Sequence, residues 1–391
     1  MWLILEMLLW LDVALLGLAY VGYPVILSVV ASLRPRPTVA GGGVTGPVTL
    51  VVSLHDEATV IDEKIGNALA LEGAPPPMIL LADDGSQDGS EEVCRRAAEA
   101  HPGRIAHVRV GRGGKNRALN RALEDVREGI VVFSDANPMY EPDALTRIVE
   151  PLRDPRVGCV VGQLRFHAGG RTLEGAYWRY EDLVKRKESA CGSMVVGNGA
   201  ILAVRRGLVP ELLPGLANDL QIPLAVARAG FRTVFHPGAV ALEYLSDSNE
   251  EEFDRKVRMA IRGLSHVGEM IRLAPGVLKL QFFLHKILRW LTGVALLEIL
   301  ALTVALVLAR GGIYLWLLGA QGLFYGAALL GRVSERAGVR IPATRFPLYF
   351  VVMHLAGLQA TWRVLRGDRV ETWESPLSTR RPGRDGGTGL R

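Results

Sequence analysis

Cysteine is scarce in this chain, and the cysteines that occur are far apart. The 391 residues include three, Cys94, Cys159 and Cys191, and no two of them have a Cys-x-x-Cys spacing. An odd and scattered set is typical neither of a disulfide framework nor of a zinc site. The sequence therefore fits a reducing compartment.

Basic stretches interleaved with aromatic residues are also missing. The net charge is +5, and arginines are concentrated beside the apolar segments at the two ends of the chain. Arginine in that position usually faces cytoplasm and anionic lipid. We therefore expect a membrane surface beside these residues, and no nucleic-acid partner.

Apolar residues are abundant, and they gather at the two ends. Hydrophobic residues make up 49% of the chain, and the mean hydropathy is positive. Residues 1–33 predict a transmembrane helix, because the run is long enough to span a bilayer and lacks the basic start of a signal peptide. Arg34 and Arg36 follow it, so the C-terminal side of this helix is predicted to be cytoplasmic.

The C-terminal end, residues 291–366, predicts more membrane segments. Leu291–Ala309 and Ile313–Leu330 are long apolar runs. Phe346–Trp362 is shorter and has basic residues on both sides, so it is predicted either to cross the membrane or to form a re-entrant or interfacial helix. Residues 273–290 are typical of an interfacial amphipathic segment, and residues 367–391 of a basic cytoplasmic or disordered tail.

The middle of the chain has a different pattern. A Gly-rich linker over residues 34–47 leads into residues 48–272, where short apolar runs alternate with helical patterns. Strands that alternate with helices predict βαβ units, an α/β fold and a largely parallel sheet. The predicted strands are Val48–Leu54, Met78–Ala82, Ile105–Val110 and Ile130–Ser134.

Polar and acidic clusters follow three of these strands. They are His55-Asp56-Glu57, Asp83-Asp84-Gly85-Ser86 and Asp135-Ala136-Asn137. Single clusters of this kind are often helix caps or turns. Because parallel sheets bind ligands at the carboxyl ends of their strands, three clusters in series predict one shared crevice.

Two further positions could serve a phosphate-containing substrate. Lys115 lies in a Gly-rich loop that opens a helix, which brings an ammonium group and a helix N-terminus to one place. Asp219 follows Asn218 and opens another helical pattern; its spacing alone indicates a helix cap. Tyr177, Trp178 and Tyr180 predict an amphipathic helix packed beside the membrane, with an acceptor-binding face as the alternative.

The order of these motifs resembles the family 2 glycosyltransferases, and within them the membrane-bound branch with hyaluronan, chitin and cellulose synthases and bacterial exopolysaccharide glycosyltransferases. The resemblance runs from about Val48 to the final membrane segments. It implies a GT-A fold, which is a Rossmann-like mixed, mostly parallel sheet, with transmembrane helices at both ends. The motifs that carry it are Val51–Glu57, Asp83–Ser86, Gly113–Asn120, Phe133–Asn137 with Glu141–Leu145, Gly197–Ala200, Asn218-Asp219 and Arg255–Met259.

The resemblance also implies roles for single residues. Asp219 matches the general base, Asp135 and Asn137 match the two ends of the Asp-x-Asp motif that holds Mg²⁺ or Mn²⁺, and Asn198, Asn218 and Met259 lie on the acceptor side. The implied nucleotide- and donor-binding residues are His55, Asp56, Glu57, Asp84, Lys115, Asp135, Arg255 and Arg258.

The implied activity is that of an inverting glycosyltransferase in polysaccharide or glycolipid biosynthesis. It would move a sugar from a nucleotide-sugar donor, a UDP-sugar, to a lipid-linked or saccharide acceptor at the cytoplasmic face of the inner (plasma) membrane. The implied partners are this donor, a membrane lipid or lipid-linked acceptor, and the lipid bilayer.

Three departures from the family pattern bear on this activity. Asn137 replaces an aspartate and brings no charge to a metal. Asn218 replaces a glutamate beside the general base, which is a milder loss than the one at position 137. Met259 replaces a tryptophan at the acceptor end and is less rigid, which favours single transfer over polymer synthesis. The alternatives are a processive polysaccharide synthase and a non-catalytic membrane scaffold subunit of a polysaccharide export complex.

Overall fold

The protein is described by a computed structural model. The described residues are 2–39, 46–73, 76–166, 173–244, 249–339 and 341–370. Part of the predicted linker, residues 40–45, and most of the predicted tail, residues 371–391, lie outside them.

A mixed eight-stranded sheet forms the centre of the soluble domain. Its strand order is β3-β2-β1-β4-β7-β6-β8-β5. β1 pairs in parallel with β2 and β4, whereas β7 runs antiparallel to both of its neighbours. This confirms the predicted α/β fold with a mixed sheet. The strands are β1 (Val48–Leu54), β2 (Met78–Asp83), β3 (Ile105–Arg109), β4 (Ile130–Asp135), β5 (Met139–Tyr140), β6 (Val157–Phe166), β7 (Leu202–Arg205) and β8 (Arg232–Glu243).

Helices cover both faces of the sheet, because successive residues of its central strands point to opposite sides. Leu50 and Val52 of β1 join one buried cluster and Val51 joins the other. The first cluster includes residues of α3 (Ile61–Leu69), α4 (Ser90–Ala100) and α6 (Ala144–Val149), and the second includes residues of α5 (Lys115–Leu123) and α8 (Asn218–Arg228).

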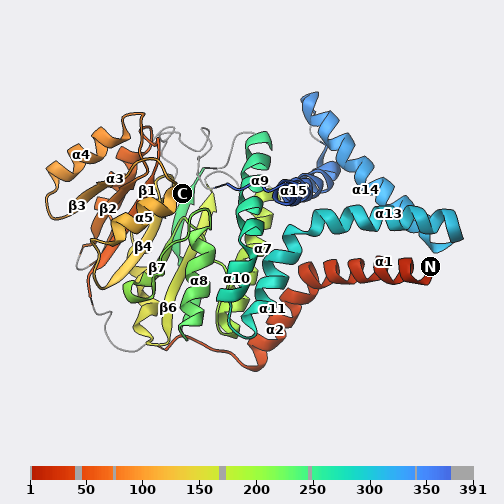
Figure 1. The fold of residues 1–391 in the computed structure, drawn as a ribbon, viewed down its shortest axis with the longest axis horizontal. Coiled ribbons are helices and arrows are strands. Elements are labelled where there is room, and N and C mark those ends of the chain that lie inside the picture. Colours follow the sequence, from red (N-terminus) through yellow and green to blue (C-terminus); the bar gives the residue numbers. More distant parts are fainter. Residues whose placement is uncertain are drawn as a thin grey trace, which may run out of the picture.

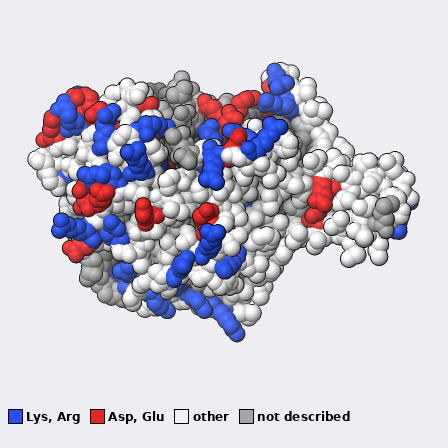
Figure 2. Space-filling model, viewed as in Figure 1, with Lys and Arg blue, Asp and Glu red and all other residues white. Residues whose placement is uncertain are grey.

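Three helices project away from this domain, as Figure 1 shows for α1 (Trp2–Gly17), α13 (Thr292–Arg310) and α14 (Ile313–Arg336). On the face seen in Figure 2, the projecting part carries few charged residues, whereas charges are dense over the sheet domain. Among the described residues, four helices are long and apolar enough to cross a membrane: Trp2–Leu33, Thr292–Arg310, Ile313–Arg336 and Pro342–Leu365. The protein is therefore membrane-associated.

The N-terminal helix is not straight, although the sequence predicts one helix over residues 1–33. A π-helical segment, η1 (Leu18–Gly22), interrupts it, and α2 (Tyr23–Leu33) turns away from α1 to pack on α7 (Leu173–Cys191). At 1.5 Å per residue, α1 and η1 together are roughly 30 Å long, the thickness of the hydrocarbon core of a bilayer.

The last apolar helix, α15 (Pro342–Leu365), has a different direction from α1 and α13. Figure 1 shows it nearly end-on, while α1 and α13 lie in the plane of the view. Its Ala356 and Ala360 pack on α9 (Asn249–Ser265), a helix of the soluble domain. The C-terminal half of this helix is therefore held against the soluble domain.

The segment predicted to lie in the interface, residues 273–290, follows α10 (Val267–Leu273), and its second half packs against protein. It contains α11 (Leu278–Phe282), η4 (Phe283–Ile287) and α12 (Leu288–Trp290). His285 is fully buried and lies between two carboxylates, with its Nδ1 atom 2.7 Å from Glu188 and its Nε2 atom 3.3 Å from Glu181. His285, Lys286 and Arg289 of this segment therefore have carboxylate partners on α7, whereas Lys279 is exposed. Two short 3-10 helices complete the fold, η2 (Glu150–Arg153) and η3 (Arg206–Leu208).

Candidate active site

The ends of β1, β2 and β4 enclose a small pocket of 20 Å³. The register places Ser53 opposite Asp135 and Leu54 opposite Asp83, so the residues that follow these strands meet at one edge. Five of the predicted donor-binding residues line the pocket: His55, Glu57, Asp84, Lys115 and Asp135. Asp56 and Asn137 are not among the lining residues.

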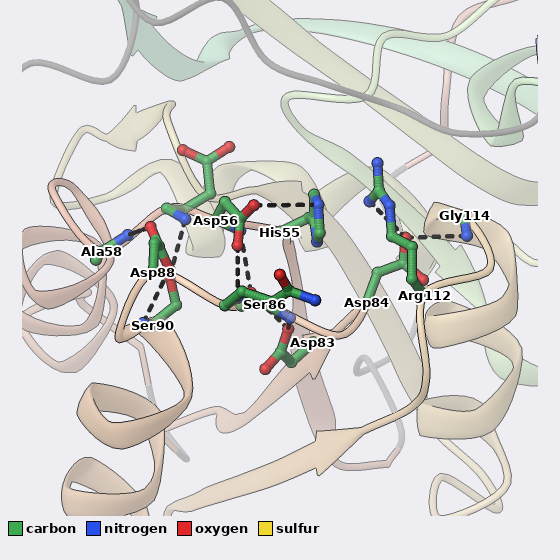
Figure 3. A network of polar contacts seen from close by, with 12 residues as sticks. His55, Asp56, Ala58, Asp83, Asp84, Ser86, Asp88, Ser90, Arg112 and Gly114 are labelled. Carbon is green, nitrogen blue, oxygen red and sulfur yellow. Dashed lines mark hydrogen bonds and ion pairs between the residues drawn. The ribbon is translucent and has the colours of Figure 1, made fainter.

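The Asp84 carboxylate forms hydrogen bonds with the Gly-rich loop (Figure 3). Its carboxylate accepts hydrogen bonds from the backbone N–H groups of Gly113 and Gly114, each at 2.9 Å, and from Arg112 at 2.8 Å. The side chain is almost completely buried. Asp84 therefore holds the loop that presents Lys115, in addition to lining the pocket.

Asp56 connects the loops after β1 and β2 through hydrogen bonds (Figure 3). Its φ is 52°, and no other non-glycine residue in the described part of the chain has a positive φ. This conformation is strained. The Asp56 carboxylate accepts a hydrogen bond from Gln87 N–H at 2.7 Å, and its own N–H donates to Ser86 at 3.0 Å. This role is structural, and it positions the neighbouring His55.

Asp83 is the buried anchor under the same loops. Burial alone would raise the pKa of its carboxyl group, but hydrogen bonds from His107 and Ser86 outweigh burial and lower the pKa. A carboxylate held in this way stays ionised and fixes the turn after β2.

Lys115 and Asp135 form an ion pair at the point where the small pocket meets a larger cavity. Ser53 also donates a hydrogen bond to Asp135, at 3.0 Å. Gly199 lies beside them, since a Cβ atom there would come within 3.1 Å of the Asp135 carboxylate and 3.5 Å of the Lys115 ammonium. The absent side chain leaves room for a bound group to approach both charges.

Behind Asp135, α3 supports the loop that contains Asn137. Lys64 is fully buried, donates a hydrogen bond to the carbonyl of Pro138 and lies 4.0 Å from the centre of the Tyr140 ring. Asn67 exchanges two hydrogen bonds with the backbone of Tyr140, at 2.8 and 2.9 Å. The loop is thus fixed from the side opposite to the pocket.

The buried Lys64 predicts a pH-dependent stability. Burial lowers its pKa to about 7, against a weaker opposing effect of Asp135, so between pH 7 and roughly 10 the unfolded chain binds this proton more tightly than the folded one. The stability of the wild type should therefore fall, relative to Lys64→Met, as the pH is lowered through this window. Thermal unfolding of the detergent-purified proteins at pH 7.5 and 9.5 measures the difference. The exposed Lys279, changed to Met, is the control, and a difference that does not change with pH would contradict the prediction.

The larger cavity has a volume of 620 Å³ and extends from Lys115 and Asp135 toward the membrane helices. Its predicted lining residues are Asn198, Asn218, Asp219, Arg255 and Met259, together with Lys115 and Asp135. Its other walls come from η1, α7, α9, η4, α12 and α15, which contribute Tyr20, Tyr177, Trp178, Tyr180, Glu181, Lys185, Lys256, Arg262, His285, Lys286, Arg289, Phe346, Phe350, Met353 and His354.

Asp219 lies in the first turn of α8 and lines this cavity. No side-chain hydrogen bond caps the start of α8. Asp219 is therefore not the helix cap that its spacing alone indicates. The N–H of Gly197 donates to the Asp219 carbonyl at 2.7 Å, and Asn198 fixes the same loop through Gly162 and Ile201. The loop that touches Asp135 at Gly199 therefore also touches Asp219.

The arginines of α9 differ in position. Arg255 lines the cavity and pairs with Glu252 at 2.8 Å. Arg258 is not among the lining residues, whereas Arg262, one turn later, is. Burial lowers the pKa of Arg262, and Asp219 and Asp135 oppose this shift, so its guanidinium lies in the field of both acids. Arg262 shares a helix face with Arg255 and Met259 by i, i+4, i+7 spacing, a signal that the sequence contains.

The aromatic residues of α7 line the cavity, and Trp178 also packs on Phe166 of β6, so this helix face both packs and borders the cavity. Tyr177 and Trp178 have the ammonium group of Lys256 at 5.1 and 5.7 Å from their ring centres. Aromatic faces with nearby cations and polar groups suit a sugar or another amphipathic ligand.

Within the part of the chain that the structure describes, no group of three or more His, Cys, Asp or Glu side chains could hold a metal ion. Asp135 offers one carboxylate toward both pockets. Mg²⁺ is often bound through one or two carboxylates plus substrate phosphates and waters. The donor set therefore fits a metal that arrives with a phosphate-containing substrate, rather than a closed protein site.

Two groups of curated proteins are similar to the chain. An N-acetylglucosaminyltransferase of Rhizobium leguminosarum bv. viciae is 22% identical over 247 residues, which cover 59% of this chain and 58% of that protein. A poly-beta-1,6-N-acetyl-D-glucosamine synthase of Staphylococcus epidermidis is 22% identical over 225 residues, 55% of this chain and 54% of that protein. The chain thus spans little more than half the length of these relatives.

Among solved structures, a mannosyltransferase of Pyrobaculum calidifontis in complex with GDP-Man and Mn²⁺ has a similar fold. The TM-score is 0.71 at 24% identity, and the match covers 92% of this chain and 99% of that one. The shared fold therefore includes the terminal helices. Residues 46–262, which contain every motif of the site described above, match the protein family described as Glycosyltransferase like family 2. The chain is thus a glycosyltransferase with a GT-A fold, and it belongs to the Glycosyltransferase like family 2.

Proposed function

We propose that this protein is an inverting glycosyltransferase that moves a sugar from a nucleotide-sugar donor, a UDP-sugar, to a lipid-linked acceptor. One observation supports this most: the pocket at the strand ends and the cavity that reaches the membrane helices share Lys115 and Asp135. A donor bound across this junction would have its sugar in the cavity, where Asp219 also lies.

The residues around the small pocket suit the nucleoside and pyrophosphate of the donor, which would lie across its mouth, because the enclosed 20 Å³ holds no more than about one water molecule. His55 and Glu57 line it beside the loop held by Asp84. Lys115 stands in the first turn of α5, so its ammonium group and the helix N-terminus both favour an anion. Arg262 and Arg255 would add positive charge on the cavity side, whereas Arg258, on the same helix, does not line the cavity.

A divalent ion, Mg²⁺ or Mn²⁺, would be held by Asp135 and Asn137 together with the donor phosphates. When bound, it would neutralise charge on the leaving nucleotide. The protein's own contribution is to hold Asp135 through Ser53 and to fix the Asn137 loop from behind through Lys64.

Asp219 is the proposed general base. It would accept the proton of the acceptor hydroxyl, which would attack the anomeric carbon from the side opposite to the leaving nucleotide, so the configuration inverts. Asn198 would hold the loop between Asp135 and Asp219, while Asn218 and Met259 would border the acceptor.

The catalytic domain would face the cytoplasm at the inner membrane. Arg34 and Arg36 follow the N-terminal helix, and Arg332 at the end of α14 pairs with Glu250 of α9 at 2.7 Å. Basic residues at both places favour the cytoplasmic side. With α15 lying along the interface, α1, α13 and α14 would cross the bilayer.

A processive polysaccharide synthase is the second candidate, because one group of relatives carries the name poly-beta-1,6-N-acetyl-D-glucosamine synthase. The exposed Met259 in the cavity favours single transfer, since it offers no rigid aromatic platform to a growing chain.

A donor screen tests the proposed function. The full chain in detergent, with Mn²⁺ and membrane lipid extract, is incubated with UDP-N-acetylglucosamine, UDP-glucose and GDP-mannose, and released nucleotide is measured. We expect release from one UDP-sugar, with a lipid-soluble product that carries one sugar. Release from none of the donors would reject the proposal, and a ladder of product lengths would favour the processive candidate.

A further inference from the structure

The segment that leads into α8 is tightly packed. Residues 211–217, the base loop, end directly before α8, the helix whose first turn contains Asp219. Leu216 of this loop is completely buried. Gly215 has a φ of 73°, and a Cβ atom there would come within 3.0 Å of the His266 side chain. Contacts that fix the base loop therefore also fix the start of the helix that carries Asp219.

The donor side of the protein holds the base loop through α5. Asn116 follows Lys115 in this helix and is almost completely buried. Its amide group donates hydrogen bonds of 2.6 Å to the carbonyl oxygens of Leu213 and Leu216. Asn120, one turn later, exchanges two hydrogen bonds with the backbone of the same loop, each of 2.9 Å. The helix that presents Lys115 to the donor therefore also supports the loop before Asp219.

Arg262 of α9 holds the base loop from the acceptor side. Its Nε–H group donates a hydrogen bond of 2.9 Å to the Gly215 carbonyl, and its Nη2 atom lies 3.5 Å from the Leu216 carbonyl. The side chain is 7% exposed and lines the large cavity. Burial lowers the pKa of Arg262, whereas Asp219 and Asp135 oppose this shift. Arg262 therefore contacts the base loop and lies in the electrostatic field of the proposed base itself.

The helix that carries Arg262 is itself held in place. Ala260 belongs to one buried cluster with Ala356 of α15. Gly263 lies against the Trp290 ring, which leaves no room for a Cβ atom at this position. The guanidinium group thus reaches the base loop from a packed helix, as the support of a catalytic group requires.

We propose that Arg262 is a positioning residue for Asp219. It holds the base loop from α9 while Asn116 holds it from α5, so the two residues together set the position of the Asp219 carboxylate relative to the donor. This inference rests on the proposed glycosyl transfer with Asp219 as its base, and it adds a residue that keeps this base in place. The family resemblance implies roles for Arg255 and Arg258 of the same helix, and none for Arg262.

A change at Arg262 should affect the transfer step more than donor binding. A general base must lie within hydrogen-bond distance of the proton that it accepts, and a displacement of about 1 Å can lower a rate by about 10²-fold. The described residues that line the small pocket include neither Arg262 nor the base loop. We therefore expect kcat to fall while the donor KM stays close to that of the wild type.

A double-mutant cycle on the full chain in detergent tests the inference. Sugar transfer is measured for Arg262→Gln, Asp219→Asn and the double variant, with the reactive one of the three donors, Mn²⁺ and membrane lipid extract. Arg262→Gln alone should lower kcat by about 10- to 100-fold and change the donor KM by about threefold at most. Beside Asp219→Asn, the same change should lower kcat by about twofold at most, because the group that Arg262 positions is already lost.

Two controls show whether a loss comes from misfolding. Calorimetric binding of UDP with Mn²⁺ should stay within about threefold of the wild type in every variant. Arg272→Gln, which changes an exposed arginine of α10, should keep full transfer. Arg262→Lys keeps the charge and a donor group and serves as the second variant. It should lower kcat less than Arg262→Gln does, and its loss should also disappear beside Asp219→Asn.

The outcomes separate this inference from the proposed function. If Asp219→Asn loses transfer but the losses in the double variant are additive, the proposed base stands and Arg262 is rejected as its positioning residue. Unchanged kcat in Arg262→Gln would reject it as well. A loss of UDP binding in Arg262→Gln equal to its loss of transfer would assign this arginine to the donor, and would also overturn the inference. Full transfer by Asp219→Asn would instead reject the base in the proposed function.

Discussion

Asp219→Asn should lower the rate of sugar transfer by about 10²- to 10⁴-fold, the usual contribution of a positioned general base. The amide has nearly the same shape, and the contact from Gly197 is to the Asp219 backbone carbonyl, so the loop should stay in place. The donor pocket does not include Asp219. Binding of UDP with Mn²⁺, measured by calorimetry, should therefore remain close to that of the wild type.

The control for this substitution is Asp62→Asn. Asp62 also lies in the first turn of a helix, α3, but it is exposed. Both changes remove one negative charge from a helix N-terminus, so any loss through the helix dipole is common to the two variants. Full transfer by Asp219→Asn, or an equal loss in both variants, would reject Asp219 as the base.

Asp135→Asn should lower kcat/KM by about 10²- to 10³-fold, because it removes charge from the one place where both pockets meet. Asp135 faces Lys115 and Ser53 and, with Asn137, would hold the divalent ion. The substitution should weaken metal-dependent UDP binding as well as transfer, unlike Asp219→Asn. Calorimetry with and without Mn²⁺, combined with nucleotide release, separates the two effects.

The reverse change, Asn137→Asp, restores the carboxylate that the family pattern has. It should lower the Mn²⁺ concentration needed for half-maximal activity, because a charged ligand replaces an amide. Asp143→Asn is the control, since Asp143 pairs with Arg147 at the surface. A metal response that neither Asp135→Asn nor Asn137→Asp alters would exclude this pair as the metal ligands.

Much of the donor side could be predicted from the sequence. Three clusters after three apolar strands predict a crevice, and the register of β1 with β2 and β4 brings His55, Asp84 and Asp135 to one pocket. This succeeds because parallel strands that are neighbours in a sheet end at the same edge. The sequence does not reveal that the Asp84 and Asp56 carboxylates accept hydrogen bonds from neighbouring loops, because those contacts depend on the path of the backbone.

The acceptor side could be predicted much less. The cavity needs α7, α9, η4 and α15, whose residues lie far apart in the sequence, and no local pattern encodes their contact. The spacing of Tyr177 and Trp178 on a helix predicts packing, with ligand binding only as the alternative. Lys64 and Lys185 look like ordinary surface lysines in the sequence, yet both are buried.

The sequence by itself determined the α/β domain, its apolar ends and the set of polar residues at the strand ends, because periodicity and strand-end chemistry are local. Only the tertiary structure decided that Asp219 lines a cavity rather than capping its helix, that α15 lies beside α9, and that Arg262 and Lys185 join the site. These features depend on contacts between segments that are far apart in the sequence. Such contacts form only when the chain folds and buries these residues and pairs their charges.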